Sequence, residues 1–121
     1  CFCGILRRTD HRLRFAPGGH HPFPRLWHGG RCEEIETRGN AVGLYEGAEF
    51  ANRERTLPRS FKLGLFSDGI LELPVAEGAK GKADRLAALG GDTAGAVAAI
   101  CAGAGAGLPD DVTFLTVTSD G

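Results

Sequence analysis

Two short apolar segments, each with aspartate at one end, limit the folds open to this chain more than any other feature. Residues 61–66 have the pattern of a buried strand that stops just before Asp68, and residues 112–118 have the pattern of a strand that starts directly after Asp110-Asp111. Residues 79–104 between them favour helix, with a glycine pair near the middle. One helix would run away from the end of the first strand and the other would return to it. The two strands would then be antiparallel.

This arrangement brings Asp68, Asp110 and Asp111 to one edge of the sheet, although they are far apart in sequence. Crowded carboxylates repel one another unless a cation compensates for their charge. Hard divalent cations prefer oxygen ligands, so three converging carboxylates predict a metal site. Gly69 fits this interpretation, because a residue without a side chain leaves the turn open. Each aspartate also has a plainer interpretation, because SDG and PDD are common turn sequences.

The rest of the chain is consistent with an α+β fold built on antiparallel strands. Two hairpins, a proline-rich loop and an edge strand are expected before the buried strand, and two helices separated by Gly90-Gly91 after it. Asp92-Thr93 is available to cap the second helix. The expected hairpin strands are 1–7 with 12–15 and 26–28 with 32–37, the loop is 17–24, and the edge strand lies within 49–57.

Length and composition indicate one structural unit with a single core. The chain has 121 residues, of which 42% are hydrophobic and 24% are charged, and its formal net charge of -1 argues against a nucleic-acid binder. Its apolar stretches are shorter than a membrane span, and its first residues lack the pattern of a secretory signal. We therefore expect a cytoplasmic protein that binds neither nucleic acid nor membrane.

Four segments carry a family resemblance. They are LRFAPGGHHP at 13–22, GNAVGL at 39–44, FSDGILE at 66–72 and DDVTFL at 110–115. They resemble the L.Y..AGH.P, G..LG, TDG..E and DD.T.L motifs of metal-dependent serine/threonine phosphatases of the PPM type, specifically the SpoIIE branch. The resemblance covers nearly all of the chain, in the family's order and spacing.

The resemblance implies an antiparallel β-sandwich flanked by helices, of which residues 1–121 would be the carboxy-terminal portion of a single phosphatase domain. The amino-terminal part, with a Gly-Asp motif that bridges both metals, would lie upstream. Phosphatases of this type use two Mn or Mg ions to activate water for attack on phosphoserine or phosphothreonine. The fragment alone would then be inactive.

The resemblance also implies roles for individual residues. Asp68 and Asp110 would be the metal ligands, with Asp111, Gly69 and Glu72 in support. The expected substrate is a phosphorylated protein, often an anti-sigma-factor antagonist in this family, and a receiver or sensor domain is expected upstream.

Two departures from the family pattern stand out. Pro17-Gly18 replaces a small residue before the Gly-His pair, and Ser67 replaces threonine while keeping the hydroxyl group. His20 in the same loop would orient phosphate or substrate, although loop histidines beside prolines more often pack or form hydrogen bonds.

Two other functions fit parts of the sequence. A phosphatase-like adaptor for a sigma-factor regulator would share the fold without the catalysis. A zinc-stabilised domain would use cysteine and histidine ligands, whereas the plainer interpretation is that the cysteines are free and buried as small apolar residues. The candidate zinc ligands are Cys1, Cys3, Cys32 and one of His20, His21 and His28.

Arginines gather in the first hairpin. They would contact an acidic protein partner or form a solvated strand face. The cluster consists of Arg7, Arg8, His11, Arg12 and Arg14.

Overall fold

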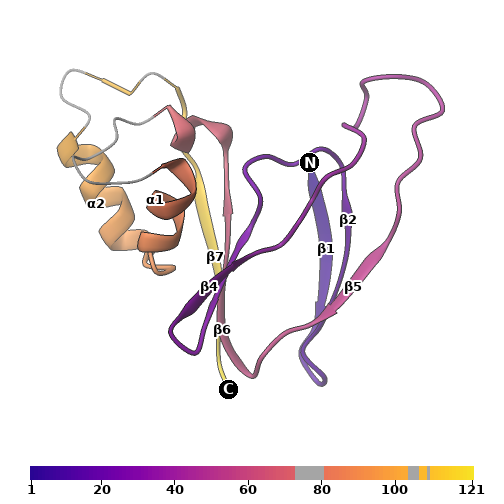
Figure 1. Ribbon diagram of the computed structural model, residues 1–121, viewed down its shortest axis with the longest axis horizontal. Helices are drawn as coiled ribbons and strands as arrows, with labels where there is room; N and C mark the ends of the chain where they lie inside the picture. Colours follow the sequence, from indigo (N-terminus) through magenta and orange to yellow (C-terminus); the bar gives the residue numbers. More distant parts are fainter. Residues whose placement is uncertain (73–80, 104–106, 109) are drawn as a thin grey trace.

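A computed structural model of the chain describes residues 1–72, 81–103, 107–108 and 110–121. Its strands form two antiparallel sheets that pack against each other (Figure 1). One sheet has the order β1-β2-β5 and the other has the order β4-β3-β6-β7. The predicted α+β sandwich is therefore confirmed.

The three-stranded sheet contains the first predicted hairpin and the predicted edge strand. Its strands are β1 (Phe2–Arg7), β2 (Arg12–Pro17) and β5 (Arg53–Thr56). Pro17 was expected in the following loop, but it is the last residue of β2 and faces Phe2 in register. A strand end tolerates proline because few ladder hydrogen bonds are lost there.

The four-stranded sheet contains the second hairpin and the two strands that carry the aspartates. Its strands are β3 (Arg25–His28), β4 (Arg31–Glu34), β6 (Ser60–Phe66) and β7 (Phe114–Asp120). β6 and β7 pair directly in antiparallel register, from Ser60 opposite Asp120 to Phe66 opposite Phe114. The predicted antiparallel arrangement is confirmed, although β7 begins two residues later than expected.

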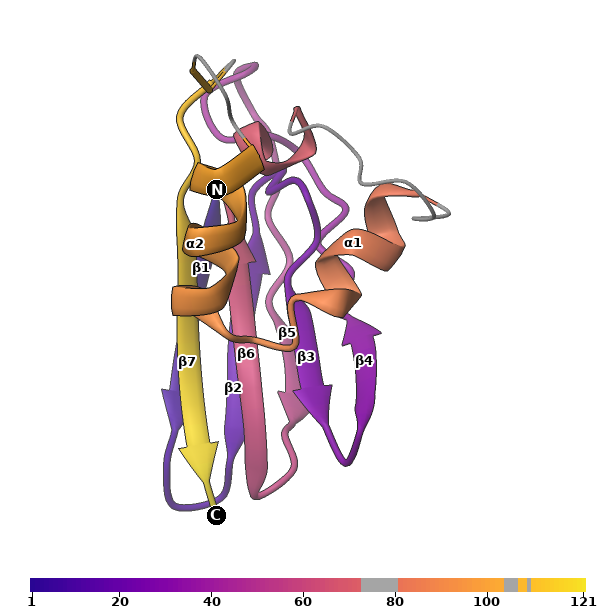
Figure 2. The same cartoon turned by 90° about the vertical axis from the view of Figure 1, so that its left-hand side faces the viewer.

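Helices cover one face of the four-stranded sheet (Figure 2). They are the 3₁₀ turn η1 (Asp68–Leu71), α1 (Lys82–Ala88) and α2 (Thr93–Gly103). Gly90-Gly91 separates α1 from α2 with positive φ angles of 61° and 70°, and the Asp92 carboxylate accepts the N–H of the residue three positions later. The predicted pair of helices and its cap are confirmed. No helix in the described ranges is long and apolar enough to cross a bilayer.

Two hydrophobic cores hold these layers together, and β6 contributes to both. Phe61 and Leu63 face the other sheet, whereas Phe66 faces the helices. Each large apolar side chain that is fully buried contributes roughly 1.5–3 kcal/mol. The core between the sheets comprises Leu13, Phe15, Leu26, Ile35, Leu57, Phe61 and Leu63, and the core under the helices comprises Trp27, Phe66, Ile70 and Leu86.

Trp27 fastens α1 to the sheet. Its indole Nε1 donates a hydrogen bond of 2.8 Å to the Ala87 carbonyl oxygen. The indole packs against Gly64 of the neighbouring strand, where a Cβ would come within 2.6 Å of the ring.

A polar contact also joins the two sheets. One carboxylate oxygen of Glu33 on β4 is 2.6 Å from His28 Nε2. The other oxygen accepts a hydrogen bond from Arg55 on β5. The Arg55 guanidinium, and after it His28, holds the pKa of Glu33 below its ordinary value. The charged form of Glu33 therefore stabilises the fold.

We predict that Glu33→Gln lowers the melting temperature at neutral pH. A carboxylate with a lowered pKa contributes stability above its unfolded pKa of about 4.3 and loses it as pH falls through the folded value. The difference in melting temperature between wild type and variant should therefore shrink below about pH 4. Glu36→Gln is the matched control, because Glu36 makes only an exposed 3.6 Å ion pair with Arg38. A difference that stays constant with pH would contradict this account.

Candidate metal centre

The ends of β6 and β7 are joined by hydrogen bonds that continue beyond the last strand pair. Ser67 N–H donates to the Thr113 carbonyl oxygen at 3.0 Å, and Thr113 N–H donates to Ser67 Oγ at 2.8 Å. Ser67 Oγ in turn donates to the Asp111 carbonyl oxygen at 3.2 Å. We call these three groups, Ser67, the Asp111 carbonyl and the Thr113 amide, the Ser67 bridge. It connects segments that are 44 to 46 residues apart.

Asp68 follows the Ser67 bridge directly and begins η1. Its side chain is exposed, but the backbone is fixed on both sides. Ile70 is only 1% exposed in the core under the helices, and its N–H donates to the Ser67 carbonyl oxygen at 3.3 Å. The buried anchor and the bridge together determine where Asp68 lies.

Gly69 lets the other strand end approach. A Cβ at Gly69 would lie 2.2 Å from the Asp111 carbonyl oxygen and 3.4 Å from the Asp110 Cβ. The first distance is far shorter than any real contact, so this position needs glycine. The predicted approach of the Asp68 segment to Asp110-Asp111 is confirmed.

The three carboxylates do not form the predicted cluster. Within the part of the chain that the structure describes, no group of three or more His, Cys, Asp or Glu side chains is placed to hold a metal ion. One reason is local: Asp110 Oδ1 accepts the Asp111 N–H at 2.7 Å and so turns toward its own backbone. Both Asp110 and Asp111 are exposed to solvent.

The oxygen ligands at the paired ends of β6 and β7 are of the type that a hard cation binds, but there are few of them. Asp68, Asp110 and Asp111 carry carboxylate oxygens, and none of them has a salt-bridge partner among the described residues. No charged side chain among the described residues neutralises them, which leaves their oxygens available to a cation such as Mn²⁺ or Mg²⁺. The assignment of Asp68 and Asp110 as ligands stays a prediction.

The remaining predicted site residues have other contacts. The Glu72 N–H donates to the Gly69 carbonyl oxygen at 3.1 Å and closes η1, while its side chain is exposed. The segment after β2, which contains His20, lies at the same upper end of the sheets as η1 (Figure 1). The His20 ring lies 6.1 Å from the Phe2 ring, and burial lowers the pKa of His20. These contacts give His20 a packing role, and its role with substrate stays a prediction.

The cysteines do not assemble the alternative zinc site. Cys1 and Cys3 are exposed at the beginning of the three-stranded sheet, whereas Cys32 is half-buried on β4 of the other sheet. The expectation that the cysteines are buried is wrong: Cys1, Cys3 and Cys101 are exposed, and Cys32 is only half-buried.

The arginine cluster forms a solvated strand face. Arg7, Arg12 and Arg14 are exposed and make ion pairs with Asp10 and Glu54. Exposed pairs of this kind contribute little to stability.

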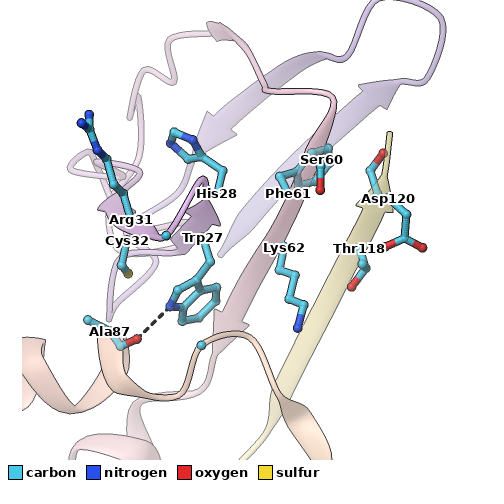
Figure 3. A pocket seen from close by; sticks show the side chains of 13 residues that line it. Trp27, His28, Arg31, Cys32, Ser60, Phe61, Lys62, Ala87, Thr118 and Asp120 are labelled. Atoms are coloured by element: carbon cyan, nitrogen blue, oxygen red, sulfur yellow. Dashed lines mark hydrogen bonds between the residues drawn. The ribbon is translucent and has the colours of Figure 1, made fainter.

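A hollow lies at the end of the β6–β7 pair away from the aspartates (Figure 3). It has a volume of about 450 Å³ and borders Trp27, Lys62, Thr118 and Asp120. No sequence pattern indicated it, because its lining comes from strands and a helix turn that are distant in the chain.

Solved structures of phosphatase domains share this fold. The phosphatase domain of the cell fate determinant SpoIIE from Bacillus subtilis, presoaked with Mn, has a TM-score of 0.71 at 15% identity, covering 99% of this chain and 56% of that one. Another structure of the same domain has a TM-score of 0.69 at 14% identity, and the match covers 100% of this chain and 58% of that one. The structure of the RsbU and RsbW domains of a Mycobacterium tuberculosis protein has a TM-score of 0.73 at 22% identity. The match covers 98% of this chain and 35% of that one.

These likenesses show the fold, and the chain spans little more than half of the Bacillus domain. The sequence family described as Stage II sporulation protein E (SpoIIE) matches residues 1–120. The chain therefore belongs to the SpoIIE family. A search of the curated proteins found no match.

We predict that Gly69→Ala destabilises the protein by about 1–3 kcal/mol, because the new Cβ must push the Asp111 carbonyl oxygen aside. Thermal unfolding measures the loss. Gly107→Ala is the matched control, since a Cβ at Gly107 meets nothing within 4 Å. Equal stability of the two variants would show that the close approach is not required.

Proposed function

We propose that the chain is the carboxy-terminal portion of a metal-dependent protein serine/threonine phosphatase domain. The observation that carries the proposal is the junction of β6 and β7, which brings exposed aspartates without salt-bridge partners to the end of the sheet. Membership of the SpoIIE family and the likeness to a phosphatase domain presoaked with Mn support this assignment.

Asp68 and Asp110 would hold the metal ions, with Asp111 and Glu72 nearby in support. Two Mn or Mg ions bound there would supply an activated water for attack on a phosphoserine or phosphothreonine phosphorus. The chain's own residues position the carboxylates: Gly69 leaves the space, and the Ser67 bridge joins the two strand ends. No side-chain nucleophile is required.

The proposed activity belongs to a longer domain than these 121 residues. The carboxylates of the described residues are too few for a complete two-metal site, so further ligands would come from elsewhere in the domain. The chain by itself would be inactive. Its coverage of 56% of the Bacillus phosphatase domain supports this division.

The proposed substrate is a phosphorylated bacterial regulator, such as an anti-sigma-factor antagonist, in the cytoplasm. The Mycobacterium tuberculosis relative carries RsbU and RsbW domains in one protein, which supports a place for this chain beside other signalling domains, such as a receiver or sensor domain.

An adaptor without catalysis is the second candidate. The absence of a three-residue metal cluster among the described residues is also what an adaptor would have. Release of phosphate by the full-length protein distinguishes the two functions.

We predict that Asp68→Asn and Asp110→Asn each lower Mn²⁺-dependent dephosphorylation of a phosphoserine peptide by the full-length protein. The loss should be at least about 100-fold, because even partners of metal ligands contribute about 10–100-fold. Asp120→Asn is the matched control, since Asp120 lies at the other end of β7.

Unchanged activity in both Asp68→Asn and Asp110→Asn would exclude the proposed site. A wild-type protein that releases no phosphate but binds a sigma-factor regulator would favour the adaptor.

A further inference from the structure

We propose that Ser67 is a positioning residue, whose hydroxyl sets the place of Asp68 relative to Asp110. This inference rests on the proposed function, because it concerns the same carboxylates. Ser67 itself would not touch metal or substrate. Its Oγ holds the strand end that carries Asp110 and Asp111, while its backbone leads directly into Asp68.

The hydroxyl takes the place of a backbone carbonyl. In an antiparallel ladder, two residues of a hydrogen-bonded pair exchange both N–H···O bonds. Ser67 and Thr113 continue the register of the β6–β7 pair, and Ser67 N–H does donate to the Thr113 carbonyl oxygen at 3.0 Å. The return bond is different, because Thr113 N–H donates to Ser67 Oγ at 2.8 Å.

Because Thr113 N–H bonds to the hydroxyl, the Ser67 carbonyl oxygen does not receive the usual ladder bond. It accepts the Ile70 N–H at 3.3 Å, which is the bond that begins η1. Asp68 can therefore leave the sheet and enter the 3₁₀ turn without leaving Thr113 N–H unsatisfied. An ordinary ladder bond at this point would have to share that oxygen with the turn.

The same hydroxyl also fixes the other carboxylate segment. Its proton goes to the Asp111 carbonyl oxygen at 3.2 Å, and that oxygen lies against Gly69. A hydroxyl group can donate and accept at once, which alanine and valine cannot do. Serine and threonine satisfy both requirements, which explains why the Ser67 replacement of the family's threonine keeps the chemistry.

The test measures Mn²⁺ affinity of the full-length protein by isothermal titration. Ser67→Ala should weaken Mn²⁺ binding about 10–100-fold, the usual effect of losing a group that orients a metal ligand. Ser67→Thr should bind Mn²⁺ as the wild type does. Ser119→Ala is the matched control, because Ser119 Oγ donates a comparable 2.8 Å bond to the Arg59 carbonyl oxygen at the far end of the same strand pair.

A second readout follows the bridge itself. Hydrogen exchange of the Thr113 amide should be faster in Ser67→Ala than in the wild type and unchanged in Ser119→Ala, and an unchanged rate in Ser67→Ala would contradict the bridge. If Ser67→Ala does not fold, Ser67→Cys keeps a donor and an acceptor at the same position, with a larger atom and weaker hydrogen bonds, and should give an intermediate loss of Mn²⁺ affinity.

The outcomes separate the inference from the proposed function. Wild-type Mn²⁺ affinity in Ser67→Ala, or an equal loss of affinity in Ser119→Ala, would overturn the role of Ser67 and leave the phosphatase proposal standing. A wild-type protein that binds no Mn²⁺ would overturn the proposed function and this inference together.

Discussion

The direct pairing of β6 with β7 is the constraint on which the rest of this structure depends. β6 places Phe61 and Leu63 in one core and Phe66 in the other, so the same strand anchors the second sheet and the helices. Its partner must return antiparallel after the two helices, which fixes where the chain re-enters the sheet. The strand ends that carry the aspartates meet because the hydrophobic cores determine the register of these two strands.

The paired ends of β6 and β7 differ from an ordinary strand end in the hydrogen bonds that their polar groups make. A serine hydroxyl replaces one ladder acceptor, a glycine admits a carbonyl oxygen, and a buried isoleucine fixes the turn that follows. Together they keep Asp68 and Asp110 at adjoining strand ends, where both side chains are exposed and neither has a salt-bridge partner among the described residues. Exposed carboxylate oxygens without a charged partner are available to a hard cation.

Sequence patterns predicted most of the fold because apolar runs, glycine pairs and turn residues act locally. The buried strand, the hairpins and the divided helices all follow from such signals. The details that failed depend on single polar contacts: β7 starts late because Thr113 N–H is bound to Ser67 Oγ, and the carboxylates did not cluster because Asp110 accepts its own neighbour's N–H. No periodicity encodes such contacts, and the part played by the Ser67 hydroxyl emerges only when both strand ends are placed.

The proposed function requires the β6–β7 junction to bind the metal ions. Paramagnetic broadening by Mn²⁺ in NMR spectra of the full-length protein tests it most directly, because the effect falls steeply with distance from the ion. At low Mn²⁺ concentration, the amide signals of residues 67–69 and 110–113 should broaden first, while those of Ser60 and Asp120 at the other end of the same strands stay sharp. Broadening that begins elsewhere, or that is absent from the junction, would contradict the account.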